Sequence, residues 1–318
     1  MIEVIKPGLS TTVQDLGRVG YYDVGIPPSG ALDQFSLTAA NLLVGNDEGA
    51  AGLELAYLGP ELRFGERAVV AVAGAELIPR LDGEERPLWE AFEVASGSVL
   101  SFAHLRGGAR AYLAVAGGID VPPVLGSRST YALGSLGGFS GRPLAAGDEL
   151  PVGPASAAAA PRAVPAELRP AFGNELEIRV VMGLYDHLLT DDTFLTSTWT
   201  LTPTADRVGF RYKGPKLGML EREQPFGAGS DPSNIVDAPY PIGSIQVPGG
   251  VEPIILHRDA VSGGGYAMIA TVISADMDTV AQSAPGAKTR FVAVDLDGAL
   301  AARADRNRRL QALRDALA

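Results

Sequence analysis

Residues 109–115, Ala-Arg-Ala-Tyr-Leu-Ala-Val, form a short and almost wholly apolar run. Three runs of the same kind precede it, at residues 68–73, 76–81 and 98–103, and Gly, Pro and Asp separate them. No long stretch with helical periodicity lies between these runs. Short strands at this spacing are typical of a β-sandwich or β-barrel rather than of a doubly wound sheet. The pattern therefore predicts a mainly β fold.

The same pattern returns after a break in the middle of the chain. Residues 156–172 are rich in Pro and Ala and poor in core residues, which predicts a linker. The later apolar runs are at residues 177–182, 244–247, 253–257, 267–273 and 290–294. A length of 318 residues suits two domains of about 150 residues each. We expect domains at 1–155 and 173–318.

Two helices are predicted at the periphery of these domains. Leucine, phenylalanine and alanine recur at helical spacing over residues 32–43, with Ser29 or Asp33 as the start and Gly45-Asn46 as the stop. Residues 298–318 repeat the pattern near the end of the chain. One face of this second helix carries Leu300, Ala304, Leu310, Leu313 and Leu317. It is expected to dock by that face.

Composition excludes several classes of function. The formal net charge of −11 disfavours binding to nucleic-acid backbones, which requires clustered Lys and Arg. The first residues lack a secretory signal, and no apolar run approaches the roughly 18 residues of a membrane span. There is no cysteine, hence no disulfide framework. A cytoplasmic protein that binds neither membrane nor nucleic acid is expected.

Familiar catalytic motifs are missing from the sequence. It contains no G-x-x-x-x-G-K-[ST] loop for ATP phosphates and no G-x-S-x-G nucleophile elbow. The three histidines do not have the spacing of zinc ligands, so no metal is expected. No Met-Lys-Met tripeptide is present for the attachment of biotin. The chain thus lacks the usual ATP-phosphate loop, the nucleophile motif of a self-contained serine or cysteine hydrolase, and the biotin attachment site.

A polar loop between residues 10 and 33 is the main candidate site. It carries Gln14, Asp15, Arg18, Ser29 and Asp33 among glycines and prolines. The following helix would present N–H groups to an anion, Arg18 could clamp a carboxylate, and the other side chains could orient a small amide. The alternative is that these side chains only satisfy their own backbone, as Asp, Ser and Thr often do in such loops.

Further candidates lie in three later segments. Arg128 belongs to a loop of glycine, hydroxyl and arginine that suits an anion, or else forms a solvated corner. Arg207 belongs to a second arginine-containing loop, and Gln246 alternates with apolar neighbours on a strand, so that it faces either a cavity or water. His257 with Asp259 could transfer protons, although a structural histidine is the favoured interpretation.

These segments resemble the allophanate hydrolase subunit 2 family, also called the KipA family. The resemblance runs in order from about residue 8 to residue 291. Its blocks are Thr11–Tyr21, Gly25–Asp33, Ala40–Asn46, Leu53–Glu54, Tyr112–Ile119, Val124–Thr130, Gly141–Leu144, Gly214–Leu217, Gly243–Pro248, Gly264–Tyr266 and Ala281–Gly286. The family includes the C subunit of bacterial 5-oxoprolinase and is similar to part of the carboxyltransferase domain of urea carboxylase.

The resemblance implies two cyclophilin-like β-barrel domains with a few peripheral helices. It also implies a heteromer with a KipI-like chain, which is the B subunit of 5-oxoprolinase, and possibly with the A subunit, a lactam hydrolase. The implied activity is ATP-dependent hydrolysis of a small cyclic amide, 5-oxoproline to glutamate. ATP would be used by the complex. An allophanate hydrolase subunit 2, a biotin-dependent urea carboxyltransferase component and a KipA-type regulator of a kinase inhibitor remain open alternatives.

The site residues divide into two groups under this interpretation. Gln14, Asp15 and Asp33 are expected to be catalytic, without one of them being singled out as the base. The expected substrate-binding residues are Arg18, Ser29, Arg128, Arg207 and Gln246. Arginines would hold a carboxylate or a phosphorylated intermediate, while the amide and carboxylates would orient the ring amide or its attacking water.

Overall fold

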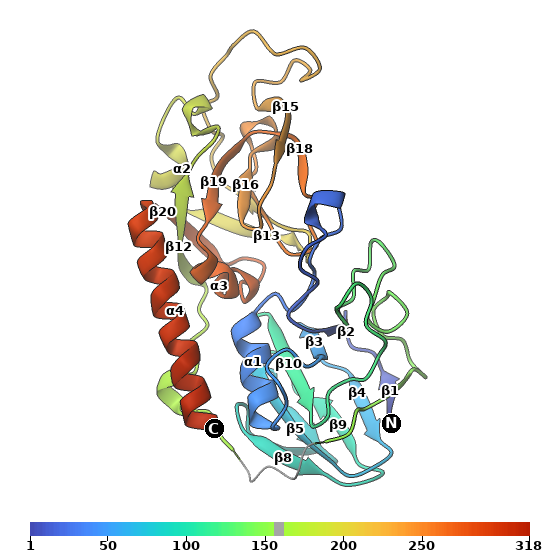
Figure 1. Cartoon of the computed structure of the whole chain (residues 1–318). Coiled ribbons are helices and arrows are strands. Elements are labelled where there is room, and N and C mark those ends of the chain that lie inside the picture. The colour runs from blue at the N-terminus through green and yellow to red at the C-terminus, as the bar shows by residue number, and fades with distance from the viewer. Residues whose placement is uncertain (156–161) are drawn as a thin grey trace. The chain divides into compact units, whose positions relative to one another are not determined.

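A computed structural model describes residues 1–155 and 162–318 of the chain (Figure 1). Its described part is mainly β, with several sheets and few helices, which confirms the predicted class. The chain divides into two compact units. Unit 1 comprises residues 1–18, 29–172 and 308–318, and unit 2 comprises residues 19–28 and 173–307.

The units and the predicted domain ranges differ in two segments. Residues 19–28 belong to unit 2, where Tyr22 Oη donates a hydrogen bond to the carbonyl of Tyr240 (2.8 Å). Residues 308–318 belong to unit 1. The first part of the predicted linker, residues 156–161, lies outside the described residues, whereas Val164 in its second part is fully buried in unit 1. The composition of residues 19–28 and of residues 308–318 does not distinguish either segment from its neighbours in the sequence.

Unit 1 contains two antiparallel sheets. The first has the strand order β11-β1-β4-β9-β6-β7, and the second has the order β2-β3-β10-β5-β8. The first sheet is built from β11 (Glu149–Leu150), β1 (Ile2–Lys6), β4 (Glu61–Phe64), β9 (Val99–Phe102), β6 (Pro79–Leu81) and β7 (Glu84–Glu85). The second is built from β2 (Thr12–Gln14), β3 (Gly52–Ala56), β10 (Arg110–Val115), β5 (Ala68–Gly74) and β8 (Ala91–Val94).

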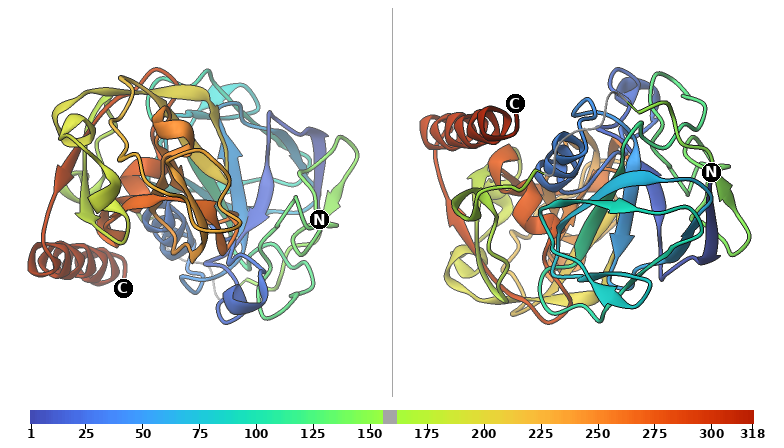
Figure 2. Two further views of the ribbon diagram at one scale, coloured as in Figure 1. Left: turned by 90° about the horizontal axis from the view of Figure 1, so that it is seen from above. Right: turned by 90° about the horizontal axis from the view of Figure 1, so that it is seen from below.

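Both faces of the second sheet in unit 1 are covered. Leu113 and Val115 of β10 enter a core shared with the first sheet, whereas Tyr112 and Ala114 enter a core shared with helix α1 (Gln34–Leu43). The view from below in Figure 2 shows α1 beside these strands. Because both faces are buried, every residue of β10 is buried, which explains why residues 109–115 read as a continuous apolar run.

Unit 2 contains a closed barrel of seven strands in the order β12-β19-β16-β17-β14-β13-β20. A parallel pair joins β12 to β20 and so closes the ring, with Glu175 opposite Lys288. The strands are β12 (Glu175–Met182), β19 (Met268–Val272), β16 (Ser244–Gln246), β17 (Ile254–Leu256), β14 (Gly209–Lys213), β13 (Trp199–Ala205) and β20 (Lys288–Ala293). A separate hairpin pairs β15 (Asn234–Pro239) with β18 (Gly263–Tyr266).

Aromatic side chains fill part of unit 2. Phe291 of β20 stacks on Phe194 of the short helix α2 (Thr193–Thr196), with 4.7 Å between ring centroids, and meets Tyr212 edge-on. Trp199 of β13 is also fully buried and donates its indole N–H to the carbonyl of Phe194. Helix α3 (Met277–Ala281) follows β19 in the chain. These large rings fill the volume that the short strands leave between them.

The expectation of a barrel in each half is met in unit 2, while the strands of unit 1 form two sheets that share a core. Edge strands β7 and β11 of the first sheet have two residues each, which is too short to carry a hydrogen-bond ladder across to the second sheet. The predicted helix over residues 32–43 is observed as α1, with Asp33 rather than Ser29 as its N-cap.

The C-terminal helix α4 spans Leu296–Leu317, close to the predicted range. Only part of the predicted docking face is buried. Leu313 and Leu317 join the core around α1, with exposures of 0% and 3%, whereas Leu300 is 50% exposed. Arg309 lies over the ring of Phe35 in the same unit, 4.5 Å from its centroid. The docking prediction is therefore confirmed for the last two turns and wrong for the first turns.

Candidate functional site

Asp15 lies at the centre of a buried hydrogen-bond network in unit 1. Its Oδ1 accepts hydrogen bonds from Gly17 N (2.7 Å), Ser127 Oγ (2.7 Å) and Ser129 Oγ (2.5 Å). Its Oδ2 accepts one from the backbone N–H of Arg128 (2.6 Å). Four donors thus converge on one carboxylate that is only 9% exposed. This arrangement fixes the loop of residues 127–129 against the end of β2.

Gln14 connects its own strand β2 to two other segments of unit 1. Its Nε2 donates to Thr12 Oγ1 (3.0 Å) and to the carbonyl of Thr130 (3.1 Å), while its Oε1 accepts from Gly30 N (3.1 Å). The side chain is fully buried. Both ends of the amide are therefore held by protein groups, which orients Gln14 rigidly.

Arg18 is buried at the end of the same loop, with 1% exposure. Its Nη2 donates to the carbonyl of Ser129 (2.5 Å). Gly137 makes room for this contact: a Cβ added there would lie 2.6 Å from Arg18 Nη2 and 2.3 Å from Ser129 O, and its φ is +67°. A side chain at residue 137 would therefore displace the guanidinium.

Ser29 and Asp33 stand on the other stem of the polar loop. Ser29 is fully buried and has a φ of +53°, a left-handed conformation that few non-glycine residues adopt. Gly30 follows with a φ of +87°, and a Cβ there would lie 2.7 Å from Gly17 N. The two stems of the loop are thus in backbone contact, which only glycine permits at this position.

Asp33 caps helix α1 with its own side chain. Its Oδ1 accepts from Ser36 N (2.9 Å) and its Oδ2 from Ser36 Oγ (2.6 Å). The sequence predicted that the N-terminus of this helix would offer its N–H groups to an anion. The capping carboxylate already occupies one of these donors and brings a negative charge to the position where the ligand was expected.

A second buried cluster, which the sequence did not predict as part of the site, adjoins Asp33. Glu54 Oε2 accepts from Leu32 N (2.9 Å) and from Tyr112 Oη (2.8 Å), and Tyr112 Oη accepts from Asp33 N (2.8 Å). Arg110 Nε lies 3.8 Å from Glu54 Oε1. Burial, reinforced by the charges of Glu54 and Asp33, holds the pKa of Tyr112 well above its usual range.

Arg128 is the most accessible of the predicted site residues in unit 1, with a side chain that is 38% exposed. Its Nε donates to the carbonyl of Val121 (2.7 Å) and its Nη2 to Asp120 (2.9 Å). Because its backbone N–H binds Asp15, the side chain is anchored at its base to the buried network. It presents a partly paired guanidinium to solvent.

The remaining predicted residues belong to unit 2. Arg207 donates from Nε and Nη2 to the two oxygens of Asp259 (2.8 and 3.2 Å), and Asp259 is 5% exposed. Gln246 is 6% exposed on β16. His257 is fully buried, and its Nδ1 accepts from Arg258 N, as the structural interpretation of this histidine expects. Asp259 is thus engaged with Arg207.

The structure accordingly brings together four of the eight predicted site residues. Asp15 binds the backbone N–H of Arg128, and Arg18 and Gln14 bind the neighbouring carbonyls of Ser129 and Thr130. Gln14 also binds the backbone N–H of Gly30, the residue that follows Ser29. Sequence reasoning missed Ser127, Ser129, Glu54 and Tyr112 as members of these networks. A buried carboxylate within an otherwise apolar strand, as at Glu54 in β3, was the available signal.

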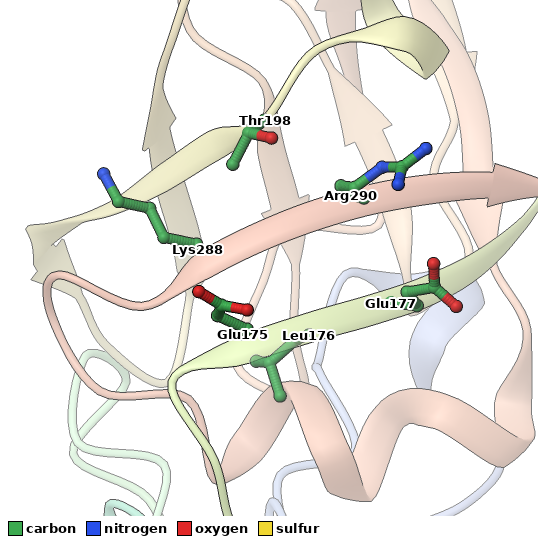
Figure 3. A pocket seen from close by; sticks show the side chains of 6 residues that line it. All are labelled: Glu175, Leu176, Glu177, Thr198, Lys288 and Arg290. Carbon is green, nitrogen blue, oxygen red and sulfur yellow. The ribbon is translucent and has the colours of Figure 1, made fainter.

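Unit 2 also carries an open pocket of about 480 Å³ on the strands β12 and β20, beside the residue that precedes β13 (Figure 3). It is lined by Glu175, Leu176, Glu177, Thr198, Lys288 and Arg290. In the strand register Glu175 stands opposite Lys288 and Glu177 opposite Arg290, so acidic and basic side chains face each other across two strands. Lys288 Nζ donates to Thr200 Oγ1 (2.7 Å). The pocket has mixed charge and shares no residue with the predicted site.

Two features are absent from residues 1–155 and 162–318. No group of three or more His, Cys, Asp or Glu side chains in these ranges is arranged to hold a metal ion. Likewise, no helix of the described chain has the length and apolar character needed to span a bilayer.

Comparison with known proteins gives consistent relatives. The family described as the carboxyltransferase domain, subdomain A and B, matches residues 24–293. The chain is 38% identical to urea amidolyase of Saccharomyces cerevisiae over 304 residues, covering 92% of this chain and 16% of that protein. It is 37% identical to the 5-oxoprolinase C subunit of Escherichia coli over 318 residues, covering 98% of this chain and 97% of that protein.

The solved structures agree with the sequence comparison. The urea carboxylase of Kluyveromyces lactis superposes with a TM-score of 0.92 at 35% identity, covering 98% of this chain and 29% of that one. The chain therefore spans less than a third of this relative, and 16% and 18% of the urea amidolyases of Saccharomyces cerevisiae and Lachancea kluyveri. The similarity to the 5-oxoprolinase C subunit extends over almost all of that protein.

Proposed function

Because the chain belongs to the family of the carboxyltransferase domain, subdomain A and B, we propose that it acts as the C subunit of a 5-oxoprolinase. In this role it contributes to the ATP-dependent opening of 5-oxoproline to glutamate within a heteromer. Its partners would be a KipI-like B subunit and a lactam hydrolase-like A subunit. The observation that carries the proposal is the match to 97% of the E. coli protein, so that nearly every part of that protein has a counterpart here.

The sequence of this chain does not contain the common loop that binds the phosphates of ATP. Its richest glycine run, Gly263–Gly265, lies in strand β18 and pairs with β15. A glycine run in a paired strand does not form the loop that cradles phosphates. We therefore propose that ATP is bound elsewhere in the complex, and we derive no step of the reaction through it.

We propose different roles for the site residues according to their accessibility. The partly exposed guanidinium of Arg128 would bind the carboxylate of the substrate. Gln14, Asp15 and Asp33, with Arg18 and Ser29, would support the reaction by holding the loop stems and the backbone N–H groups between them in place. The same proposal extends to Arg207 and Gln246 in unit 2 as substrate-binding residues. All of these assignments rest on the proposed activity.

A second candidate function is a biotin-dependent urea carboxyltransferase component. Its support is the TM-score of 0.92 to the K. lactis urea carboxylase. Biotin would have to be carried by another chain or segment, since the sequence has no Met-Lys-Met tripeptide. A regulator that binds a kinase inhibitor without turnover is the third candidate.

The test is reconstitution of this chain with its B-type and A-type partners. The complex should release glutamate from 5-oxoproline only when ATP is present, and should not carboxylate urea with added biotinylated carrier. An ATP-supplied complex without glutamate release would refute the first candidate, and biotin-dependent carboxylation of urea would establish the second. Binding of the B-type chain without either reaction would support the regulator.

We expect Arg128→Ala to raise the KM for 5-oxoproline by roughly 10- to 100-fold, because the variant loses one charge-assisted hydrogen bond to the carboxylate of the substrate. The matched control is Arg142→Ala. Arg142 is also a partly exposed arginine of unit 1 that pairs with an aspartate, Asp148, but its hydrogen bonds to Pro143 O and Asp148 lie outside the Asp15 network. Equal KM values for the two variants would contradict the assignment of Arg128.

A further inference from the structure

Four consecutive backbone N–H groups between the polar loop and helix α1 are each bound by a different acceptor. They are Gly30 to Gln14 Oε1 (3.1 Å), Ala31 to Asp15 O (2.8 Å), Leu32 to Glu54 Oε2 (2.9 Å) and Asp33 to Tyr112 Oη (2.8 Å). The acceptors come from the strand β2 and its end, from β3 and from β10. Each backbone N–H group of this segment, residues 30–33, is thus held by its own hydrogen bond.

The acceptors for Leu32 and Asp33 are unusual for a purely structural purpose. A backbone carbonyl would satisfy an N–H group without charge, as the carbonyl of Asp15 does for Ala31. Here the chain instead buries Glu54 and Arg110, each 2% exposed, beside Tyr112. Taking both charges out of water costs several kcal/mol per ion, in order of magnitude, and an apolar replacement is often no less stable. Stability alone therefore does not explain this cluster.

The geometry of the cluster explains these acceptors, because its hydrogen bonds have only one consistent assignment of donors and acceptors. Tyr112 stays protonated, since burial raises its pKa well above the usual range. Its O–H can then donate to Glu54 Oε2 while a lone pair accepts from Asp33 N. Glu54 Oε2 also receives Leu32 N, so both N–H groups are directed to points fixed by side chains of the sheet.

We infer that Glu54 and Tyr112 are positioning residues of the proposed site: they hold residues 30–33, and through them Ser29 and Asp33, in the geometry that turnover requires. The inference rests on the proposed function. Preorganised groups lower the barrier of the chemical step, so their loss should lower kcat more than it changes KM.

Two variants and a matched control test this inference in the reconstituted complex. Tyr112→Phe removes the acceptor of Asp33 N and the donor to Glu54 while keeping the ring. Glu54→Gln keeps an oxygen that can accept from Leu32 N but removes the charge. The control is Tyr212→Phe, which removes the hydroxyl of another fully buried tyrosine, on β14 in unit 2. Hydrogen–deuterium exchange of residues 29–37 and steady-state kinetics are measured for all three.

We expect Tyr112→Phe to speed exchange of the segment by about tenfold and to lower kcat by a similar factor, with KM within about twofold. Glu54→Gln should have a smaller effect of the same kind, and Tyr212→Phe should change neither quantity. The inference would be overturned if exchange of the segment stayed unchanged in Tyr112→Phe. It would also be overturned if kcat fell no further in Tyr112→Phe than in Tyr212→Phe. If the wild-type complex does not act on 5-oxoproline, the proposed function fails, and exchange alone still decides whether Glu54 and Tyr112 fix the segment.

Discussion

Asp15, which the sequence predicts to be catalytic, also holds the structure together through its hydrogen bonds. The sequence placed a carboxylate in a glycine-rich loop next to Arg18 and could not distinguish a catalytic acid from a loop anchor. In the structure four donors from residues 17 and 127–129 surround it. Three of these partners come from a segment more than 100 residues away, so no local pattern could have revealed them.

The ion pair of Arg142 and Asp148 should make the stability of the protein depend on pH. Both oxygens of Asp148 accept from Arg142 (2.7 and 2.8 Å), which lowers the pKa of Asp148 below its usual value, as does a hydrogen bond from Ala145 N. A lowered folded-state pKa adds stability that is complete above the ordinary value of 3.8 and is lost as the pH falls through the folded value.

Asp148→Asn should therefore lower the Tm at neutral pH, and the difference from wild type should shrink as the pH falls below 3.8. Because the Arg142 side chain is 43% exposed, solvent screening limits the effect to about 1 kcal/mol. Thermal unfolding of both proteins across this pH range checks it. A Tm difference that does not change with pH would show that the charge of Asp148 is not responsible.

At the level of elements, helix α1 was predictable and its environment was not. Apolar spacing over residues 32–43 and the polar residue Asp33 gave its limits closely. The sequence did not predict that the Asp33 cap lies beside the buried cluster of β3 and β10. Local periodicity does not encode which distant strands pair. Five of the seven barrel strands were predicted, whereas β13 and β14 were not, and neither was closure through the parallel pair β12 and β20.

The cap of α1 separates a structural from a chemical role for Asp33. Asp33→Ala removes the acceptor of Ser36 N and should cost about 1 kcal/mol of stability, measured by denaturant unfolding. Asp33→Asn retains an oxygen in the same position and should unfold nearly as wild type does. If the carboxylate takes part in the reaction, Asp33→Asn will lose turnover at unchanged stability. Full activity of this variant would limit Asp33 to the cap.

For the whole molecule, the division into two domains was predicted from length and composition, yet each compact unit is assembled from separate stretches of chain. Helix α4 illustrates the reason. Its residues 296–307 belong to unit 2 and residues 308–317 to unit 1, although the helix is uninterrupted. A sequence pattern describes a helix as one object and does not tell which core each turn supplies.

Leu313→Ala should destabilise unit 1 by about 2–5 kcal/mol, because it leaves a cavity beside α1 where the side chain is fully buried. The matched control is Leu300→Ala on the same helix. Leu300 is 50% exposed, so its loss should stay within about 0.5 kcal/mol. Chemical denaturation of the two variants measures the contrast. Similar losses for both would mean that the last turns of α4 do not dock as described.

The path of the chain limits how the protein can be divided into fragments. It passes from one unit to the other after residues 18, 28, 172 and 307. A fragment that stops near residue 172 would lack Leu313 and Leu317 of the unit 1 core, and a fragment that begins there would lack Tyr22 and its hydrogen bond to Tyr240. Expression of either half alone would therefore yield an incomplete unit, whereas adding residues 308–318 back in trans should restore the missing core contacts of the first half.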